Sequence, residues 1–173
     1  MNRPLGKNQD KGTYVLIISL DKTQMIKSGK LPETLYRKGI YLYVGRARRG
    51  LQARIKRHAR FGKKMHWHID YLLQKGRIQD IWIRPNFFGE CSTASMIQNF
   101  SPASEAVPKG FGSSDCRCSS HLHYFPPDTK RLDPLRKKIG FARMPDTDGN
   151  IFRHSSKCAR IDKPDVLPCW KHF

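Results

Sequence analysis

Apolar residues gather in four short runs along this chain. Residues 12–20, reading GTYVLIISL, form a β-branched apolar run between polar neighbours, which is typical of a strand buried on both faces. Residues 40–44 and 78–83 predict two more strands, and residues 118–125 predict a last one. The segment between the first two runs, residues 21–38, is polar and is expected to be a connection.

Three other segments carry apolar residues at helical spacing. From about residue 50, Leu51 and Ile55 form an apolar stripe, and the neighbouring arginines face outward. Residues 65–75 and 90–100 also have helical character. Strands and helices therefore interleave, and we expect a fold of the α/β (α+β) class in which helices pack on a short sheet.

The hydrophobic pattern ends near residue 126. Residues 127–173 are rich in Pro, Asp, Lys and Arg and keep no apolar period, so they are expected to form a basic, disordered tail. Residues 1–11 are expected to be an N-terminal extension. Residues 12–126 are then the single folded domain, which suits a chain of 173 residues.

Basic residues far outnumber acidic ones. The chain has 33 Lys and Arg against 14 Asp and Glu, a net charge of +19, and residues 37–64 hold eleven basic residues and no acid. Nucleic acid is therefore the leading partner, with an anionic membrane surface second. The N-terminus lacks the apolar core of a secretory signal, and no apolar run could span a bilayer, so we expect an intracellular, cytoplasmic protein.

Residues suited to phosphate chemistry lie in or near the basic segment. Arg54 and His58 are four residues apart, so on a helix they share one face and reach the same ligand. Glu90 is the single carboxylate between Asp80 and Glu105, and it follows a predicted strand. Phosphodiester hydrolysis needs a proton acceptor and positive charge at the phosphate, and one carboxylate with waters can hold Mg²⁺.

These residues belong to a set of motifs in a fixed order. Residues 12–14 read GTY, residues 43–45 read YVG, and Arg54, His58 and Glu90 follow. This ordered set resembles the GIY-YIG nuclease superfamily. The segments GTYVLIISL, YLYVGRARRGLQARIKRH, HWHIDYLL, EC and FGSSDCRCSSHLHYF are similar to its small branch, found alone or fused to endonuclease III.

The resemblance implies a fold, an activity and a site. The fold would be a small, largely antiparallel three-stranded sheet flanked by helices, and the activity would be metal-dependent cleavage of DNA. Tyr14 would act as the general base or orient the attacking water, and Tyr43 would lie beside the scissile phosphate. Arg54 would stabilise phosphate charge, His58 would take the tyrosine's proton, and Glu90 would bind Mg²⁺ or Mn²⁺.

The remaining basic residues of this region are expected to bind backbone phosphates without reacting. They are Arg46, Arg48, Arg49, Lys56, Arg57, Arg60, Lys63 and Lys64. Simpler roles stay open for the reactive set as well. Tyr14 and Tyr43 could fill one face of a sheet, and Glu90 could stabilise a helix N-terminus.

The cysteines offer a second kind of chemistry. Cys91, Cys116, Cys118 and His121 are enough soft ligands for a zinc site. Their spacing differs from the common zinc-finger pattern, and Cys91 is distant along the chain, so buried free thiols are expected and zinc is the alternative.

Three hypotheses for function follow from the sequence. The first is a Mg²⁺-dependent endonuclease acting on DNA rather than RNA, with structured or damaged DNA as the substrate. The second is a nucleic-acid-binding module whose nuclease site is degenerate, because Asn99 is a poorly spaced counterpart of the family's late asparagine. The third is a zinc-stabilised adaptor.

Overall fold

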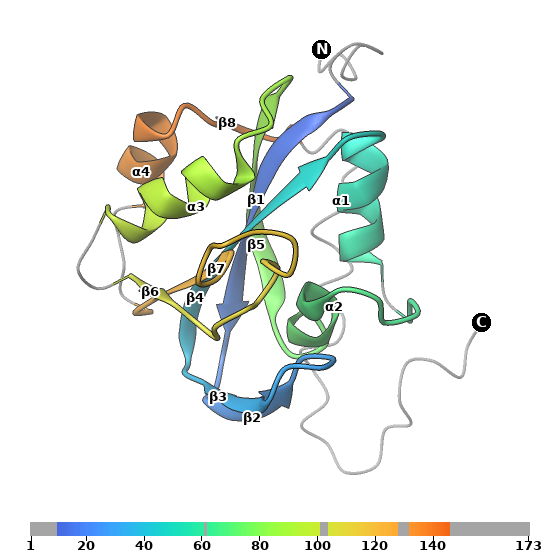
Figure 1. Ribbon diagram of the computed structural model, residues 1–173, viewed down its shortest axis with the longest axis vertical. Coiled ribbons are helices and arrows are strands. Elements are labelled where there is room, and N and C mark those ends of the chain that lie inside the picture. The colour runs from blue at the N-terminus through green and yellow to red at the C-terminus, as the bar shows by residue number, and fades with distance from the viewer. Residues whose placement is uncertain (1–9, 61, 101–103, 128–131, 146–173) are drawn as a thin grey trace.

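A six-stranded antiparallel sheet forms the centre of the fold (Figure 1). The computed structural model describes residues 10–60, 62–100, 104–127 and 132–145. In spatial order the strands are β6 (Glu105–Ala106), β7 (Leu122–Phe125), β4 (Gly39–Ala47), β1 (Gly12–Leu20), β5 (Arg77–Pro85) and β8 (Ala142–Arg143). A separate hairpin pairs β2 (Gln24–Lys27) with β3 (Glu33–Tyr36).

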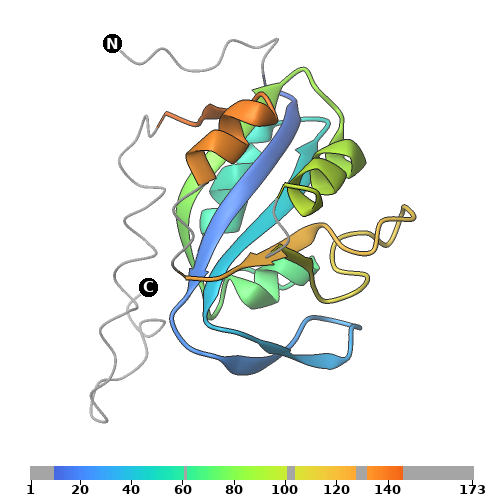
Figure 2. The ribbon, with the colours of Figure 1, turned by 90° about the vertical axis from the view of Figure 1, so that its left-hand side faces the viewer.

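The sheet is covered on both faces, as the unbroken apolar runs predict. Helices α1 (Leu51–Ala59) and α2 (His68–Leu72) pack on one face, and α3 (Glu90–Gln98) and α4 (Leu132–Lys138) pack on the other (Figure 2). Side chains alternate along β1: Tyr14, Leu16 and Ile18 point to the first core, and Val15 and Ile17 point to the second. The fold is therefore α+β, with the sheet between two helical layers.

The expected three-stranded sheet is wrong. Three of the four predicted runs became the central strands β4, β1 and β5, and the fourth, residues 118–125, contains β7. Strands β6 and β8 extend the sheet further at its two edges. The two outermost strands, β6 and β8, are two residues long. A pair of residues cannot show an alternating pattern, so main-chain pairing alone reveals these strands.

The expected disordered tail from residue 127 is also wrong in its first part. Residues 132–145 fold into α4 and β8, and Leu135, Ile139 and Phe141 are buried in the second core. Leu135 and Ile139 are four residues apart, which places both on one side of a helical turn. Residues 146–173 and 1–9 lie outside the described residues.

The hairpin β2–β3 lies between the two sequence motifs that contain Tyr14 and Tyr43. The tyrosine motifs at 12–14 and 43–45 are separated by 28 residues between Tyr14 and Tyr43, and the hairpin occupies that interval. The register of β1 and β4 still pairs Tyr14 with Gly45 and Leu16 with Tyr43. The insertion therefore leaves both tyrosine motifs side by side in the sheet. Within the described part of the chain, no helix is both long and apolar enough to cross a membrane.

Candidate active site and metal centre

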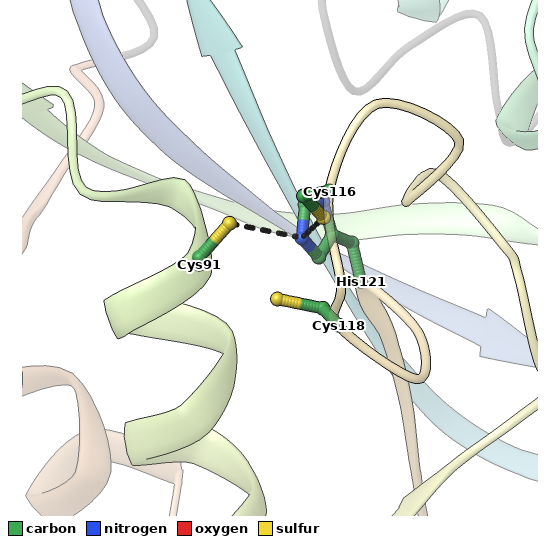
Figure 3. Close-up of side chains that lie close together, drawn as sticks. All are labelled: Cys91, Cys116, Cys118 and His121. Atoms are coloured by element: carbon green, nitrogen blue, oxygen red, sulfur yellow. Dashed lines mark hydrogen bonds between the residues drawn. The ribbon is translucent and has the colours of Figure 1, made fainter.

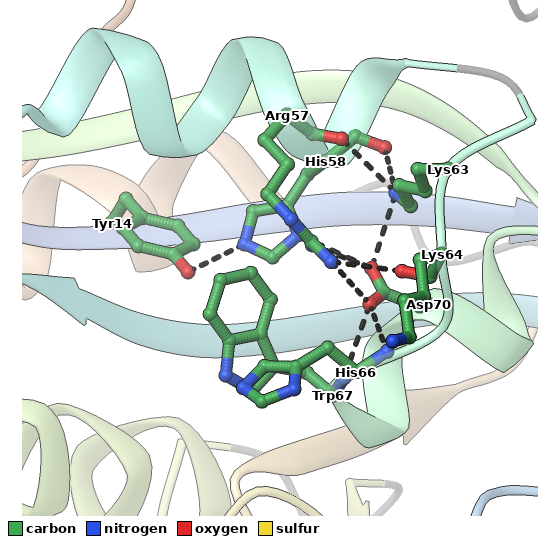
Figure 4. A network of polar contacts seen from close by, with 8 residues as sticks. All are labelled: Tyr14, Arg57, His58, Lys63, Lys64, His66, Trp67 and Asp70. Carbon is green, nitrogen blue, oxygen red and sulfur yellow. Dashed lines mark hydrogen bonds and ion pairs between the residues drawn. The ribbon is translucent and has the colours of Figure 1, made fainter.

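Tyr14 on β1 and His58 on α1 point toward each other (Figure 4). Tyr14 also lines a surface cleft. Tyr14 Oη lies 2.8 Å from His58 Nε2, and both side chains are buried. Burial, with the nearby charge of Lys63, lowers the pKa of His58 to about 3. Burial and the neighbouring Tyr43 raise the pKa of Tyr14 well above its ordinary range, against the opposing charge of Arg54. Both groups are therefore uncharged near neutral pH.

The direction of this hydrogen bond follows from the surroundings of His58. Among the residues that the structure describes, His58 Nδ1 has no hydrogen-bond partner, but it lies 4.0 Å from Asp70 Oδ1. A proton on Nδ1 faces a carboxylate favourably, whereas a lone pair there would be repelled. The neutral ring thus carries its proton on Nδ1, and the Tyr14 hydroxyl donates to Nε2. The lone pairs of the Tyr14 hydroxyl oxygen can then accept a hydrogen bond from a molecule in the cleft.

Asp70 holds the end of α1 to the start of α2. It is fully buried and accepts hydrogen bonds from both terminal nitrogens of Arg57, each at 3.1 Å, while Lys63 Nζ lies 3.2 Å from it. The backbone amides of His66 and Trp67 donate to it as well. Burial alone would raise the pKa of Asp70, but the hydrogen bonds from Arg57 and these amides lower it to about 2.

The cleft has a volume of about 680 Å³. Four of the five residues expected to be catalytic line it: Tyr14, Tyr43, Arg54 and Glu90. The fifth, His58, lies beneath and bonds to Tyr14. Gly45 is needed at this point, because a Cβ there would overlap the phenol ring of Tyr14. Burial and the nearby Glu90 raise the pKa of Tyr43 above its ordinary range, so this phenol is also neutral.

Glu90 begins α3, and neighbours hold its carboxylate from two sides. Arg46 Nε lies 3.1 Å from Oε2, and His121 Nδ1 lies 3.4 Å from Oε1. The same guanidinium reaches Asp115, with Nη2 at 2.9 Å from Oδ2. Two carboxylates that line the cleft therefore converge on one positive group. Carboxylate oxygens are the protein ligands that Mg²⁺ prefers, and in this structure both carboxylates are paired with Arg46.

Cys91, Cys116, Cys118 and His121 converge at the side of the sheet where α3 begins (Figure 3). Their ligand atoms all lie within 4.8 Å of one another, with His121 Nε2 at 3.4 Å from Cys116 Sγ and 3.8 Å from Cys91 Sγ. Ligand atoms around tetrahedral zinc are about 3.6 Å apart, given metal–ligand bonds of about 2.0–2.3 Å. The four residues could hold a metal ion.

The expected burial of these thiols is wrong, although the three cysteines are free. Cys91 is exposed, and Cys116 and Cys118 are partly exposed. Cys91 is distant from the other three residues in the sequence but close to them in the fold, because the first turn of α3 lies against the loop that precedes β7.

Comparison with known families matches residues 13–142 to a domain of unknown function, DUF123. The chain belongs to the DUF123 family. No curated protein and no solved structure gives a significant match.

In this DUF123 domain, the basic residues expected to bind phosphate fall into three groups. Those that line the cleft are Arg46, Arg48 and Arg49. Those engaged with buried Asp70 are Arg57 and Lys63. Those exposed on α1 and just after it are Lys56, Arg60 and Lys64. Arg54 lines the cleft with its guanidinium carbon 4.4 Å from the centre of the Trp67 ring.

Sequence reasoning missed the role of Asp70 and the second acid at the cleft. Asp70 is the single acidic residue between Glu33 and Asp80. Its isolation in a basic region is the feature of the sequence that could have indicated its role. Asp115 gave no comparable signal, because its place beside Arg46 depends on the path of the loop before β7. Asn99 lies at the C-terminal end of α3, opposite the end that carries Glu90, and is not part of the cleft lining.

Proposed function

We propose that this protein is a metal-dependent endonuclease that hydrolyses phosphodiester bonds in DNA, with structured or damaged DNA as its substrate. One observation carries the proposal: a single cleft is lined by Tyr14, Tyr43, Arg54 and Glu90, and the Tyr14 hydroxyl forms a hydrogen bond with His58. These are the residues to which the resemblance to the GIY-YIG nucleases assigns the reaction. The net charge of +19 supports a polyanionic substrate.

The proton route runs through Tyr14 and His58. The Tyr14 hydroxyl gives its proton to His58 Nε2, so its oxygen can accept a proton from a water in the cleft. As the water oxygen bonds to phosphorus, the water's proton passes to Tyr14 and the tyrosine's own proton passes to His58. The leaving oxygen departs with the electron pair of its bond to phosphorus and takes a proton from solvent. A pKa of about 3 makes His58 a weak base. A bound anionic phosphate would raise that pKa and favour the transfer.

Charge at the phosphate would come from arginine and from a divalent cation. Arg54 offers a permanently charged planar group that matches phosphate oxygens. Glu90, with Asp115, would hold Mg²⁺ or Mn²⁺, which supplies further positive charge where the transition state becomes more negative. Arg48 and Arg49 would contact the DNA backbone at the same cleft.

Zinc is our proposal for the ion of the Cys91, Cys116, Cys118 and His121 cluster. Thiolate and imidazole ligands favour zinc over magnesium, and four protein ligands make a closed site with a structural role. Metal analysis of protein purified without chelator tests this. We expect about one zinc per chain, and a clearly lower content would contradict a structural site.

The nuclease proposal is tested by a cleavage assay on duplex, branched and single-stranded DNA and on RNA. We expect nicking of DNA that requires Mg²⁺ or Mn²⁺ and is lost in Glu90→Ala, while DNA binding stays near wild type. Zinc content is measured for both proteins, so that loss of zinc is not mistaken for loss of the carboxylate. Absence of cleavage on every substrate with either cation would contradict the proposal.

The alternative is a binding module with the same cleft and no turnover. It is favoured by the ion pairs that Arg46 makes with Glu90 and Asp115, since these occupy both carboxylates. Such a protein would bind DNA with steep salt dependence and cut none of the substrates. The same assay therefore separates the two functions.

A further inference from the structure

We propose that the metal site and the cleft form one coupled unit, in which His121 is the positioning residue that links the zinc to Glu90. This inference rests on the proposed zinc site and on the place of Glu90 in the proposed nuclease. It goes beyond both, because it makes the state of one site depend on the other.

The two ring nitrogens of His121 face the two sites. Nε2 lies among the thiols, 3.4 Å from Cys116 Sγ, and Nδ1 lies 3.4 Å from Glu90 Oε1. The side chain is buried, and Nδ1 has no hydrogen-bond partner of good geometry among the described residues. Glu90 is therefore the group toward which a proton on Nδ1 can be directed when Nε2 binds a metal.

The backbone of His121 is held by hydrogen bonds on both sides. Its amide donates to the carbonyl of Phe111 at 2.8 Å, and its carbonyl accepts from the amide of Val44 at 2.9 Å. Val44 follows Tyr43 on β4, which lines the cleft. The main chain of His121 is thus hydrogen-bonded directly to the strand that carries Tyr43.

Glu90 is tied to the cluster a second time through the chain itself. Cys91 is the next residue, and both belong to the first turn of α3. A metal bound by Cys91 would fix the helix end from which the Glu90 carboxylate extends. On the opposite side of the cluster, Cys116 follows Asp115, which lines the cleft. The same ion would therefore hold both carboxylates of the cleft in place.

A carboxylate that accepts a hydrogen bond from a metal-bound histidine strengthens that ligand and fixes its tautomer, and its loss typically weakens metal binding by about 10–100-fold. The dependence is reciprocal, because a coupling free energy between two sites acts equally in both directions. Zinc should therefore hold Glu90 in the cleft as firmly as Glu90 holds His121 on the zinc.

Zinc affinity, measured by competition with a chromophoric chelator, tests the coupling without any nucleic acid. Glu90→Ala should bind zinc about 10-fold more weakly than wild type. Glu105→Ala is the matched control, since it removes the same side chain from β6, where Glu105 pairs with exposed Arg37. It should keep the wild-type affinity. Equal zinc affinity of wild type and Glu90→Ala would overturn the proposal, as would a wild-type protein that binds no zinc.

A second variant shows whether the coupling passes through His121. His121→Cys supplies a fourth thiolate but offers nothing to Glu90, so adding Glu90→Ala to it should leave zinc affinity unchanged. The same 10-fold loss in that background would assign the effect to another path and overturn the role of His121. Because neither measurement uses cleavage, a protein that fails to cut DNA contradicts the nuclease proposal alone.

Discussion

In the proposed nuclease, the Tyr14 hydroxyl is the group that distinguishes a catalytic cleft from one that only binds DNA. Tyr14→Phe keeps the ring that fills the first core and removes the oxygen that faces His58. We expect cleavage to fall by at least about 100-fold, the usual size of a general acid–base contribution, while DNA affinity stays the same. Single-turnover cleavage and a binding titration measure the two effects separately.

Tyr36→Phe is the matched control for this substitution. Tyr36 is another buried tyrosine, and its hydroxyl lies 3.1 Å from Ser28 Oγ, outside the cleft lining. Each variant should lose about 1 kcal/mol of stability, because each loses one buried hydrogen bond. Only Tyr14→Phe should lose cleavage. A parallel loss of activity in Tyr36→Phe would show that general destabilisation, not chemistry, explains the result.

The low pKa of His58 predicts a dependence of stability on pH. In the unfolded chain the pKa is 6.5, and in the folded protein it is about 3, so the unfolded state binds more protons between these values. The stabilising contribution is present above pH 6.5 and is lost as pH falls toward 3. At pH 5 the expected loss is about 2 kcal/mol relative to neutral pH.

His58→Gln removes this titration and keeps an acceptor for the Tyr14 hydroxyl. Urea unfolding at pH 7 and at pH 5 compares the two proteins. Wild type should lose about 2 kcal/mol more than the variant between these pH values. Equal losses would show that His58 does not titrate far below its ordinary pKa in the folded state.

At the scale of the elements, Asp70 joins α1 to α2 by means of buried charges. Asp70→Asn would leave Arg57 and Lys63 without their carboxylate, and breaking a buried pair in this way costs about 3–5 kcal/mol. Asp21→Asn is the control, since Asp21 pairs with Arg77 at the surface and should contribute less than about 1 kcal/mol. Chemical denaturation measures both. Similar small changes in the two variants would contradict a supporting role for the network.

The elements also show how far sequence patterns reach. The apolar runs predicted β1, β4, β5 and the strand that became β7, and the helical spacing of Leu51 and Ile55 predicted α1. Each pattern reflects a face buried along the whole element. Strands β6 and β8 gave no such pattern at two residues each. Helix α4 was missed because Leu135 is its single buried residue and lies among charged ones.

One part of the candidate site could be predicted from the sequence and another part could not. The five residues from Tyr14 to Glu90 could be named from ordered motifs, and the fold brings them to one cleft and its floor. The Cys/His cluster could not be judged from spacing, because Cys91 reaches the other ligands through the packing of α3 against a loop. Contacts that depend on the path of a loop are set by tertiary structure, and residue spacing does not encode them.

For the whole molecule, the +19 charge matters less than where it is placed. In the folded protein, Arg57 and Lys63 form ion pairs with Asp70. Arg48 and Arg49 are exposed and line the cleft. A basic residue that contacts a DNA phosphate releases counterions on binding, whereas a basic residue elsewhere on the surface does not. If the protein binds DNA as proposed, the salt dependence of its DNA affinity therefore reports which part of the surface the DNA covers.

We therefore expect a double substitution at the cleft to change the salt dependence of DNA affinity. Removing the same number of charges elsewhere on the surface should not change it. Arg48→Ala with Arg49→Ala should make the slope of log K against log salt shallower by about 2, because each phosphate contact contributes about 0.9. Lys27→Ala with Lys137→Ala removes two exposed charges from β2 and α4, outside the cleft lining, and should leave the slope unchanged. Fluorescence anisotropy with one DNA duplex over a series of salt concentrations measures all three slopes. If both double variants reduced the slope equally, the DNA would be bound by the overall charge of the protein and not by the cleft.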